Sequence, residues 1–207
     1  MPYLAFDIET TGLNRHSDVP IQFAYIQYDD KFMLQRAGSF YIKPSFGVWG
    51  EEAESIHGIS REYLAEHGVD PKVAAATIYA LCVRNNLVGY NSKGFDWELI
   101  TYWLDHMGLP ARTILSHLDV MTEWQRRVGK RQKLTELCTN LGYNEQYLST
   151  LTQAIFKDKH DPKHPHSADY DTTATFMCHK ALVQLMIAEA EKAQRANGPV
   201  ADVDPQL

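Results

Sequence analysis

The chain has 207 residues, of which 44% are hydrophobic and 11% aromatic, a composition that excludes wholesale disorder and fits one large folded domain. Its 20 basic and 26 acidic residues give a net charge of −6, so the chain as a whole has no excess of positive charge for a polyanion. No apolar run approaches the roughly 18 residues of a membrane span, and no basic and apolar signal segment opens the chain. We therefore expect a soluble, cytoplasmic protein with no membrane partner.

The three cysteines, Cys82, Cys138 and Cys178, are an odd number, lie far apart and include no CxxC pair. This spacing is typical of reduced core thiols and not of a disulfide framework or a thiolate zinc site. We expect all three to be free thiols in the core.

The beginning of the chain has the pattern of strands. Residues 3–8 combine aromatic and aliphatic side chains, and residues 10–14 (Thr-Thr-Gly-Leu-Asn) follow as a turn. Apolar stretches at 21–28 and 40–42, with turn residues around 29–31, predict two further strands. Together they indicate an antiparallel meander.

The pattern then changes towards helices. Residues 73–83 have the composition of a helix, and residues 87–90 form a short apolar strand. From Asp96 onward apolar residues recur at helical spacing, until Gly108 ends the run. A long helix is expected over 172–195. Its apolar face would consist of Ala174, Met177, Ala181, Leu182, Leu185 and Met186.

This order of elements, strands first and then alternating helix and strand, argues for a mixed α/β sheet domain. We expect the domain to span residues 1–196, because Asn197, Gly198 and Pro199 stop the last helix. Residues 197–207 are expected to form a flexible tail.

Two acids stand in the first expected strand. Asp7 and Glu9 lie two residues apart, so both carboxylates project from one face while Phe6 and Ile8 point to the other. Two like charges on a central apolar strand cost stability unless a cation binds them, and Mg²⁺ prefers carboxylate oxygens. The alternative is an exposed strand end with solvated acids.

Three further residues have chemistry of interest. Asp96 and Asp171 each stand near the start of an expected helix, and His166 precedes Asp171 by five residues. An acid at a helix start is commonly a cap, and a lone histidine is more often a surface or core residue than a catalyst. Taken singly, none of these positions identifies a site.

Taken together, these residues resemble the three motifs of the DEDDh family of DnaQ-like 3′-to-5′ exonucleases. The motifs are Asp7-Ile8-Glu9-Thr10-Thr11-Gly12-Leu13, Asn91-x-x-x-Phe95-Asp96 and His166-x-Ala168-x-x-Asp171. Residues 56–59 (Ile-His-Gly-Ile) and 134–138 (Leu-Thr-Glu-Leu-Cys) resemble two further family features. The resemblance implies an α/β, ribonuclease-H-like fold, in which a central mixed five-stranded sheet, an antiparallel meander plus parallel strands, is flanked by helices.

The resemblance also implies a mechanism with two Mg²⁺ or Mn²⁺ ions. Their ligands would be Asp7, Glu9, Asp96 and Asp171. Two such ions about 4 Å apart stabilise the attacking and leaving oxygens of the scissile phosphate. His166 would act as general base on the attacking water, a role that suits an ordinary pKa of about 6.5. Each cycle would release a nucleoside 5′-monophosphate from the 3′ end.

By the same resemblance, the terminal nucleotide would lie against the turn that follows the first strand. The substrate-binding residues would be Thr10, Thr11, Gly12, Leu13, His57, Asn91 and Phe95. Leu13 would wedge beside the terminal base. Two alternatives stay open, namely core packing for Phe95 and a turn role without substrate contact for Thr11.

The chain departs from the family pattern at a few places. Tyr90 stands where the family often has His, Asp169 where the residue is usually apolar, and Thr172 where it is often Ala. These departures remove no expected metal ligand or base, so they concern substrate preference more than activity. Ser167 stands where a sister group of nucleases has Tyr, which indicates the histidine type.

Two polar segments each have two interpretations. Residues 126–133 hold five basic residues in eight, and could bind the phosphates of a single strand or form a solvated helix end and loop. Three histidines within 160–166 could bind zinc, but the prolines and the lysine among them favour a loop that brings only His166 to the site. The weak basicity of the whole chain predicts modest affinity and low processivity.

The expected function is 3′-to-5′ exonuclease activity on 3′ ends of single-stranded nucleic acid, DNA in preference to RNA, in proofreading, repair or degradation. The alternatives are an RNA-trimming exoribonuclease, a nuclease that cuts internally, and a binding module that has lost activity. The intact acids argue against the binding module, and Leu13 and His57 favour cutting at an end. The resemblance leaves open a polymerase or another replication or repair protein as partner, and a homodimer.

Overall fold

The computed structural model describes residues 1–111, 116–157 and 167–196, and the expected tail over 197–207 lies outside them. The elements follow in the order β1 (Tyr3–Thr10), β2 (Pro20–Tyr28), β3 (Leu34–Tyr41), α1 (Glu51–His57), α2 (Arg61–His67), α3 (Pro71–Cys82), β4 (Asn86–Gly89), α4 (Asp96–His106), β5 (His117–Asp119), α5 (Val120–Val128), α6 (Leu134–Asn140), α7 (Glu145–Phe156) and α8 (Ala168–Ala196). Among the described helices, none is long and apolar enough to span a membrane.

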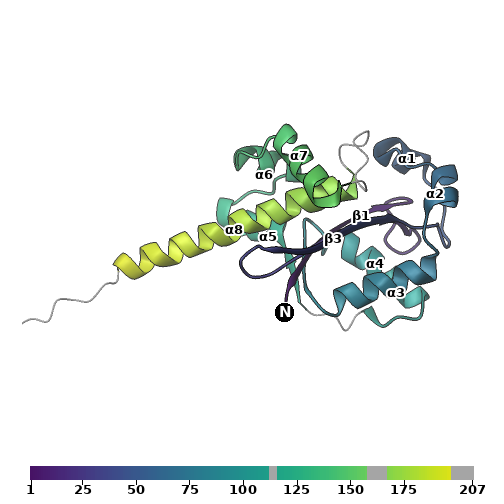
Figure 1. Ribbon diagram of the computed structural model, residues 1–207, viewed down its shortest axis with the longest axis horizontal. Coiled ribbons are helices and arrows are strands. Elements are labelled where there is room, and N and C mark those ends of the chain that lie inside the picture. The colour runs from purple at the N-terminus through teal and green to yellow at the C-terminus, as the bar shows by residue number, and fades with distance from the viewer. Residues whose placement is uncertain (112–115, 158–166, 197–207) are drawn as a thin grey trace, which may run out of the picture.

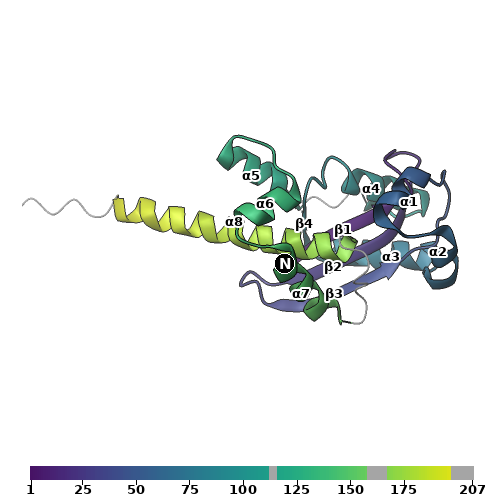
Figure 2. The same ribbon diagram turned by 90° about the horizontal axis from the view of Figure 1, so that it is seen from above.

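A single sheet of five strands forms the centre, in the order β3-β2-β1-β4-β5. β1, β2 and β3 pair antiparallel and form the expected meander, whereas β4 and β5 continue the sheet in parallel with β1. The mixed five-stranded sheet flanked by helices confirms the expected fold (Figure 2). Since β1 is the central strand, its residues are covered from both faces.

Helices cover both faces of the sheet (Figure 1). On one face, Phe6 and Ile8 of β1 pack in a core that includes residues of α3 and α4. On the other face, Ala5 of β1 and Ala24 of β2 pack with residues of α8, α6 and α7. Asp7 pairs with Ala24 across the sheet, so Asp7 faces α8, as the alternation of β1 predicted.

The boundaries of two elements differ from those expected. β3 begins at Leu34, well before residue 40, because the polar residues of this edge strand conceal its pairing with β2. α8 begins at Ala168, and its apolar face ends earlier than expected. Leu185 and Met186 are exposed, because the second half of the helix extends beyond the body of the domain (Figure 1). α1, α2, α5, α7 and β5 were not predicted.

The three cysteines are in the state that their scattered spacing predicted. Cys82, Cys138 and Cys178 are free and buried. The sulfur atoms of Cys138 in α6 and Cys178 in α8 lie 3.6 Å apart, so this pair helps to pack α6 against α8. The prediction of reduced core thiols is confirmed.

Candidate active site

Asp7 and Glu9 stand on the α8-facing side of the central strand. Burial raises the pKa of Asp7 well above its usual value, and the charges of Asp96, Asp171 and Glu9 raise it further. Burial likewise raises the pKa of Glu9, with added contributions from the charges of Asp171, Asp96 and Asp169. Asp7 and Glu9 are half-buried, so the alternative of fully solvated acids at an exposed strand end does not fit these surroundings.

Asp96 is the first residue of α4 and is buried, with 8% of its surface exposed. The N-cap residue is Phe95, and its side chain makes no capping hydrogen bond, so Asp96 is not the cap. Burial, followed by the charges of Asp119 and Asp171, raises the pKa of Asp96 to about 7. Its carboxylate is therefore part of the same electrostatic group as Asp7.

Asp171 lies in the first turn of α8, and its backbone N–H donates to the carbonyl of Ser167 at 3.1 Å. It is thus inside the helix and not at its cap. Its charge acts on Asp7, Glu9 and Asp96. The structure therefore brings together the four acids that the motifs single out, from one strand and the first turns of two helices.

These four carboxylates fit a hard divalent cation. In the described parts of the chain, no group of three or more His, Cys, Asp or Glu side chains already has the arrangement of a metal site. However, the neighbouring charges that shift the pKa values of Asp7, Glu9 and Asp96 are all carboxylates. Oxygen donors with uncompensated negative charge are what Mg²⁺ and Mn²⁺ prefer, so the donor set suits either ion.

The loop after β1 is held by Asp18, which the sequence did not single out. The Thr11 hydroxyl donates to one Asp18 carboxylate oxygen at 3.3 Å, and the Thr10 hydroxyl donates to the Gly12 carbonyl at 2.7 Å. A Cβ atom on Gly12 would lie 2.5 Å from the other Asp18 oxygen, so a larger residue at this position would have to displace the Asp18 carboxylate. Both hydroxyls thus form hydrogen bonds within the loop, which is what the alternative of a turn role for Thr11 leads one to expect. Leu13, in contrast, is 80% exposed.

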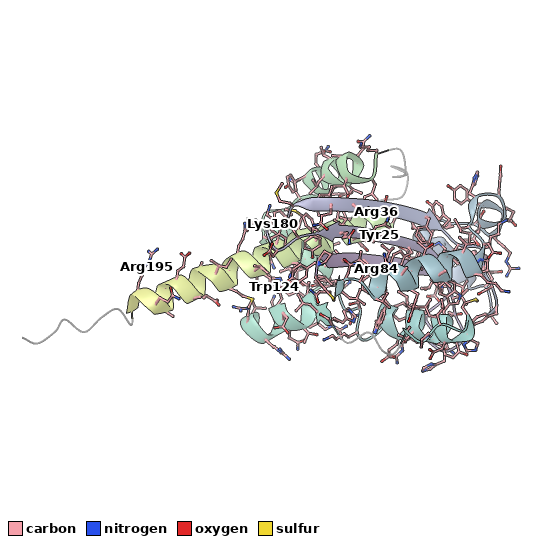
Figure 3. The ribbon with its side chains drawn as sticks, turned by 60° about the horizontal axis from the view of Figure 1, so that its bottom comes forward. Tyr25, Arg36, Arg84, Trp124, Lys180 and Arg195 are labelled. Carbon is pink, nitrogen blue, oxygen red and sulfur yellow. The ribbon has the colours of Figure 1, made fainter. Side chains whose placement is uncertain are left out.

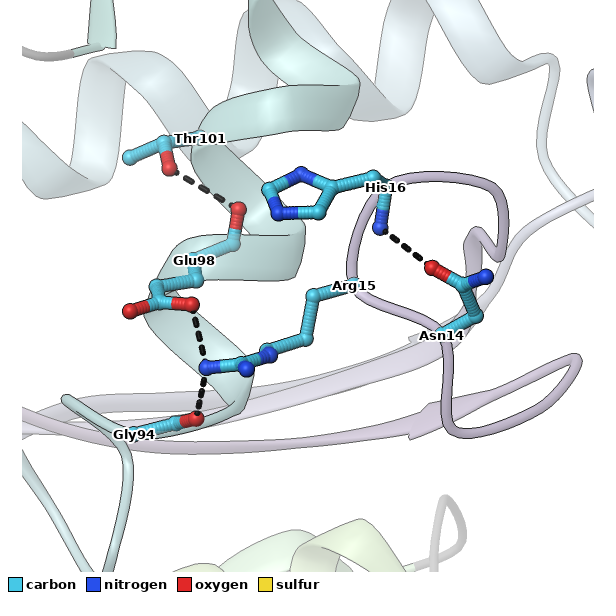
Figure 4. Close-up of polar contacts among 6 residues, drawn as sticks. All are labelled: Asn14, Arg15, His16, Gly94, Glu98 and Thr101. Atoms are coloured by element: carbon cyan, nitrogen blue, oxygen red, sulfur yellow. Dashed lines mark hydrogen bonds and ion pairs between the residues drawn. The ribbon is translucent and has the colours of Figure 1, made fainter.

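Arg15 ties the same loop to the second motif. Its guanidinium donates to the Gly94 carbonyl at 2.8 Å and forms an ion pair with Glu98 of α4 (Figure 4). The loop that presents Leu13 is therefore attached to the start of the helix that carries Asp96. Neither the pairing nor its partners could be read from the sequence, because the two segments lie far apart in the chain.

The turn that leads to Asp96 has a second support. Asn91 has a positive φ of 57°, a conformation that costs energy for a residue with a side chain. Its backbone N–H donates to Asp119 at the end of β5 (3.2 Å), and its side-chain oxygen accepts from Arg131 at 2.8 Å. Phe95 is half-buried against the core under α4, in line with the packing alternative. Asp119 was missed, although an acid directly before a helix is a recognisable cap signal.

Of the two histidines expected at the site, His57 lies within the described residues and His166 does not. His57 is buried at the end of α1, where its Nδ1 accepts from the Ile59 N–H at 3.0 Å. The Gly50 N–H before α1 donates to the Thr11 carbonyl at 2.9 Å, which joins this segment to the loop after β1. His166, the expected general base, lies outside the described residues, as does the whole histidine-rich stretch 160–166 for which zinc was considered.

The departures from the family pattern all fall at structured positions. Asp169 is buried, accepts from the Ser167 hydroxyl and from the Tyr170 N–H (3.0 Å), and raises the pKa of Glu9. The buried Thr172 hydroxyl donates within α8 to Ala168 (2.6 Å), and the Tyr90 hydroxyl donates to the Gln132 carbonyl (2.9 Å). Asp169 thus adds a fifth carboxylate behind the four.

The basic segment 126–133 pairs largely with the protein itself. Arg126 pairs with Glu123, Arg127 with Glu189 and Lys130 with Glu136, while Arg131 donates to Asn91. Exposed ion pairs of this kind are weak and salt-sensitive. The segment 126–133 therefore fits the interpretation as a solvated helix end and loop better than the interpretation as a phosphate-binding site.

Comparison with known proteins identifies relatives in both sequence and structure. The sequence model of the exonuclease family (RNase_T) matches residues 4–177. Exodeoxyribonuclease I of Buchnera aphidicola subsp. Schizaphis graminum is 31% identical over 101 residues, which cover 47% of this chain and 21% of that protein. The PolC-type DNA polymerase III of Ureaplasma parvum is 31% identical over 146 residues, which cover 70% of this chain and 10% of that protein.

Among solved structures, E. coli exonuclease I in complex with a dT13 oligonucleotide aligns with a TM-score of 0.72 at 21% identity, over 94% of this chain and 44% of that chain. This likeness shows a shared ribonuclease-H-like fold. The chain spans only 21% and 10% of the lengths of the two curated relatives. Since the family model matches most of the sequence and the matched residues include all four gathered acids, the chain belongs to the DEDDh-type, DnaQ-like exonuclease family.

Proposed function

We propose that this chain is a 3′-to-5′ exonuclease that requires Mg²⁺ or Mn²⁺ and removes nucleotides from the 3′ end of single-stranded DNA. The observation that carries the proposal is the gathering of Asp7, Glu9, Asp96 and Asp171 into one partly buried electrostatic group. A protein that only binds nucleic acid gains nothing from four mutually repelling carboxylates, which repel phosphates and cost stability.

Asp7, Glu9, Asp96 and Asp171 would hold one or two divalent ions. When bound, these ions would supply the positive charge that the carboxylates lack and that a phosphodiester in a transition state requires. Asp96 is buried and Asp7 is half-buried, so the protein displaces part of the water around these two carboxylates. The protein's own contribution is to hold these oxygens in place, through the sheet for Asp7 and through the turn fixed by Asp119 for Asp96.

The terminal nucleotide would bind where Leu13 is presented. Leu13 is exposed on a loop that Arg15 fastens to the turn before α4, so the loop with this apolar side chain is attached to the helix that begins with Asp96. The Asn91 side chain is held through its oxygen by Arg131, which leaves its amide N–H groups as donors for the substrate. General base catalysis by His166 is part of the proposal and rests on the motif alone.

The relatives support DNA in preference to RNA. One relative is named as an exodeoxyribonuclease, and the similar solved structure holds a thymidine oligonucleotide. Because the chain spans a small part of each curated relative, a role in proofreading, repair or degradation, and a replication or repair partner, rest on resemblance. One similar solved structure is a complex of exonuclease I with the C-terminus of a single-stranded-DNA-binding protein. Such a segment is a candidate partner that likewise rests on resemblance.

The test is a time course with 5′-labelled single-stranded DNA and RNA of one sequence, in Mg²⁺ and in EDTA. The variants are Asp7→Asn, Asp171→Asn and His166→Gln, and the matched control is Asp30→Asn in the exposed turn between β2 and β3. We expect a ladder that shortens from the 3′ end, on DNA faster than on RNA, which EDTA and the acid substitutions abolish. His166→Gln should lower the rate by about 100-fold or more.

A substrate with a blocked 3′ end separates the competing activities. An exonuclease stalls on it, whereas continued cutting would identify an internally cutting nuclease and overturn the proposal. Faster digestion of RNA than of DNA would show that the protein is an RNA-trimming exoribonuclease. Absence of cleavage in Mg²⁺ and Mn²⁺ by a folded protein that binds the strand would identify the binding module instead.

A further inference from the structure

A groove lies on the face of the sheet opposite Asp7 and Glu9. It has a volume of about 730 Å³ and runs between α3 and the strands β2 and β3. Its lining residues are Gln27, Arg36, Lys72, Val73, Ala76, Thr77, Ala80, Leu81, Arg84 and Asn85. Gln27 lies on β2 opposite Leu4, near the beginning of β1, so this end of the groove is remote from the catalytic end of that strand.

The charged residues of this lining are all cations. Arg36, Lys72 and Arg84 are exposed, and within the described residues none of them forms an ion pair with a carboxylate. This contrasts with the segment 126–133, where the cations pair with the protein's own acids. In a chain of net charge −6, an unneutralised basic groove is a local exception.

Arg36 is held in position. Its guanidinium carbon lies 5.9 Å from the centre of the Tyr25 ring, within the range of a cation–π contact. The ring in turn lies over Gly38, where a Cβ atom would approach it to 2.9 Å. Tyr25 and Arg36 lie on the neighbouring strands β2 and β3 and are labelled in Figure 3. Arg36 is therefore positioned by a contact within the protein.

The middle of the groove is apolar. Val73, Ala76 and Ala80 follow one another along one side of α3 at helical spacing and are exposed, and Val73 is 57% exposed. Lys72 and Arg84 stand at opposite ends of this stripe. Lys72 lies in the first turn of α3 and Arg84 lies two residues beyond its last residue, and the twelve residues of the helix span about 18 Å. An occupant must offer acids at the ends and apolar groups in the middle.

These features favour a peptide over a nucleic acid. Proteins bind single-stranded nucleic acid by stacking bases on aromatic side chains, and none of the described residues that line this groove is aromatic. An extended peptide of about six residues covers 18 Å, and its side chains alternate between two sides, so carboxylates can reach the cations while apolar groups enter the stripe.

We propose that the α3–β3 groove is a docking site for an acidic and apolar segment of a partner protein, in extended conformation. The proposal rests on charge complementarity at Arg36, Lys72 and Arg84, together with the apolar stripe between them. It is independent of the exonuclease activity, because the groove and the acids lie on opposite faces of the sheet.

The experiment measures fluorescence anisotropy of a labelled peptide of alternating Asp and Leu, about eight residues long, with the full chain in EDTA. The groove variants are Arg36→Glu/Arg84→Glu and Lys72→Glu. The matched control is Lys192→Glu/Arg195→Glu on the exposed end of α8, which has the same charge change as the double variant. We expect the double variant to weaken peptide binding at least tenfold, Lys72→Glu to weaken it severalfold, and the control to leave it unchanged.

Two further probes make the result specific. A peptide of Asp alone should bind more weakly than the alternating peptide, and Val73→Gln should reduce that difference. Equal binding of both peptides would overturn the apolar part of the site. A labelled single strand that loses affinity in the groove variants, while the peptide does not, would overturn the proposal in favour of nucleic acid. No peptide binding by the unaltered chain, or equal loss in the control, would also refute it. Exonuclease rates of the same variants are expected to stay unchanged, so failure here is distinct from failure of the proposed function.

Discussion

The carboxylate of Asp119 receives the backbone N–H groups of Asn91 and Lys93, at 3.2 and 3.1 Å, one on each oxygen. It therefore bridges the end of β5 to the turn that carries the second motif. It also accepts the N–H of Thr122 at 3.2 Å and so caps α5. One side chain thus fixes the start of a helix and the strained residue five positions before Asp96.

Asp119→Asn is expected to lower the cleavage rate by about tenfold, with a smaller effect on KM. The amide keeps one acceptor oxygen but opposes the N–H of Lys93 with its own N–H groups, so the turn before Asp96 loses its support. Asp30→Asn serves as the control. The measurement is steady-state digestion of labelled DNA alongside denaturant unfolding. A loss of stability with an unchanged rate would show that Asp119 supports the fold alone.

Asp7→Asn is expected to abolish cleavage and to stabilise the metal-free protein. The substitution removes one of several mutually repelling carboxylates from a buried place and retains its shape. A gain of about 1 kcal/mol corresponds to roughly 2–4 °C in melting temperature for a chain of this size. The comparison is thermal unfolding in EDTA and in Mg²⁺. Metal ions should raise the melting temperature of the unaltered protein and leave the variant almost unaffected; a variant that melts lower in EDTA contradicts the prediction.

In EDTA, the free energy of unfolding is expected to contain a contribution from Asp96 that decreases as the pH rises from about 4 to about 7. The pKa of Asp96 is about 7 in the folded protein against 3.8 in its ordinary surroundings, so the folded state binds the proton more tightly. One such group contributes a slope of at most about 1.4 kcal/mol per pH unit. The quantity to compare is the pH dependence of the unaltered protein and of Asp96→Asn. Parallel curves would show that folding does not raise the pKa of the Asp96 carboxyl.

Arg15→Ala is expected to raise KM for single-stranded DNA severalfold while stability changes by less than about 1 kcal/mol. Its ion pair with Glu98 is partly exposed and weak as a stabilising contact, yet together with Gly94 it fastens the loop that carries Leu13. Arg195→Ala, which removes an exposed pair at the far end of α8, is the control. A fall in kcat with no change in KM would place the role of Arg15 in the chemical step.

Local patterns predicted the central part of this protein well. The alternation of residues 3–8 predicted correctly which face of β1 holds Asp7 and which holds Phe6, because side-chain direction in a strand follows from sequence position alone. The prediction of where the apolar face of α8 ends was wrong for a different reason. Leu185 and Met186 continue the helical pattern, but exposure depends on where the body of the domain ends.

The supports of the site could not be predicted in the same way. Asp18, Asp119 and Arg131 act on residues that lie elsewhere in the chain or around a turn, and although Asp119 has the position of a helix cap, its sequence neighbours do not show that it also holds the second motif. The motifs contain the groups that carry charge at the centre. The groups that hold them depend on contacts that only the folded chain creates.

The arrangement at the beginning of β1 has a practical consequence. The Asn86 backbone N–H donates to the Pro2 carbonyl at 2.8 Å, which fastens the first residues beside the start of β4 (Figure 1). Asp7 and Glu9 lie further along the same strand, towards its other end. A tag attached at this end of β1 would consequently emerge away from Asp7 and Glu9, so this end of the sheet is the place to fix the protein to a surface while both carboxylates stay accessible.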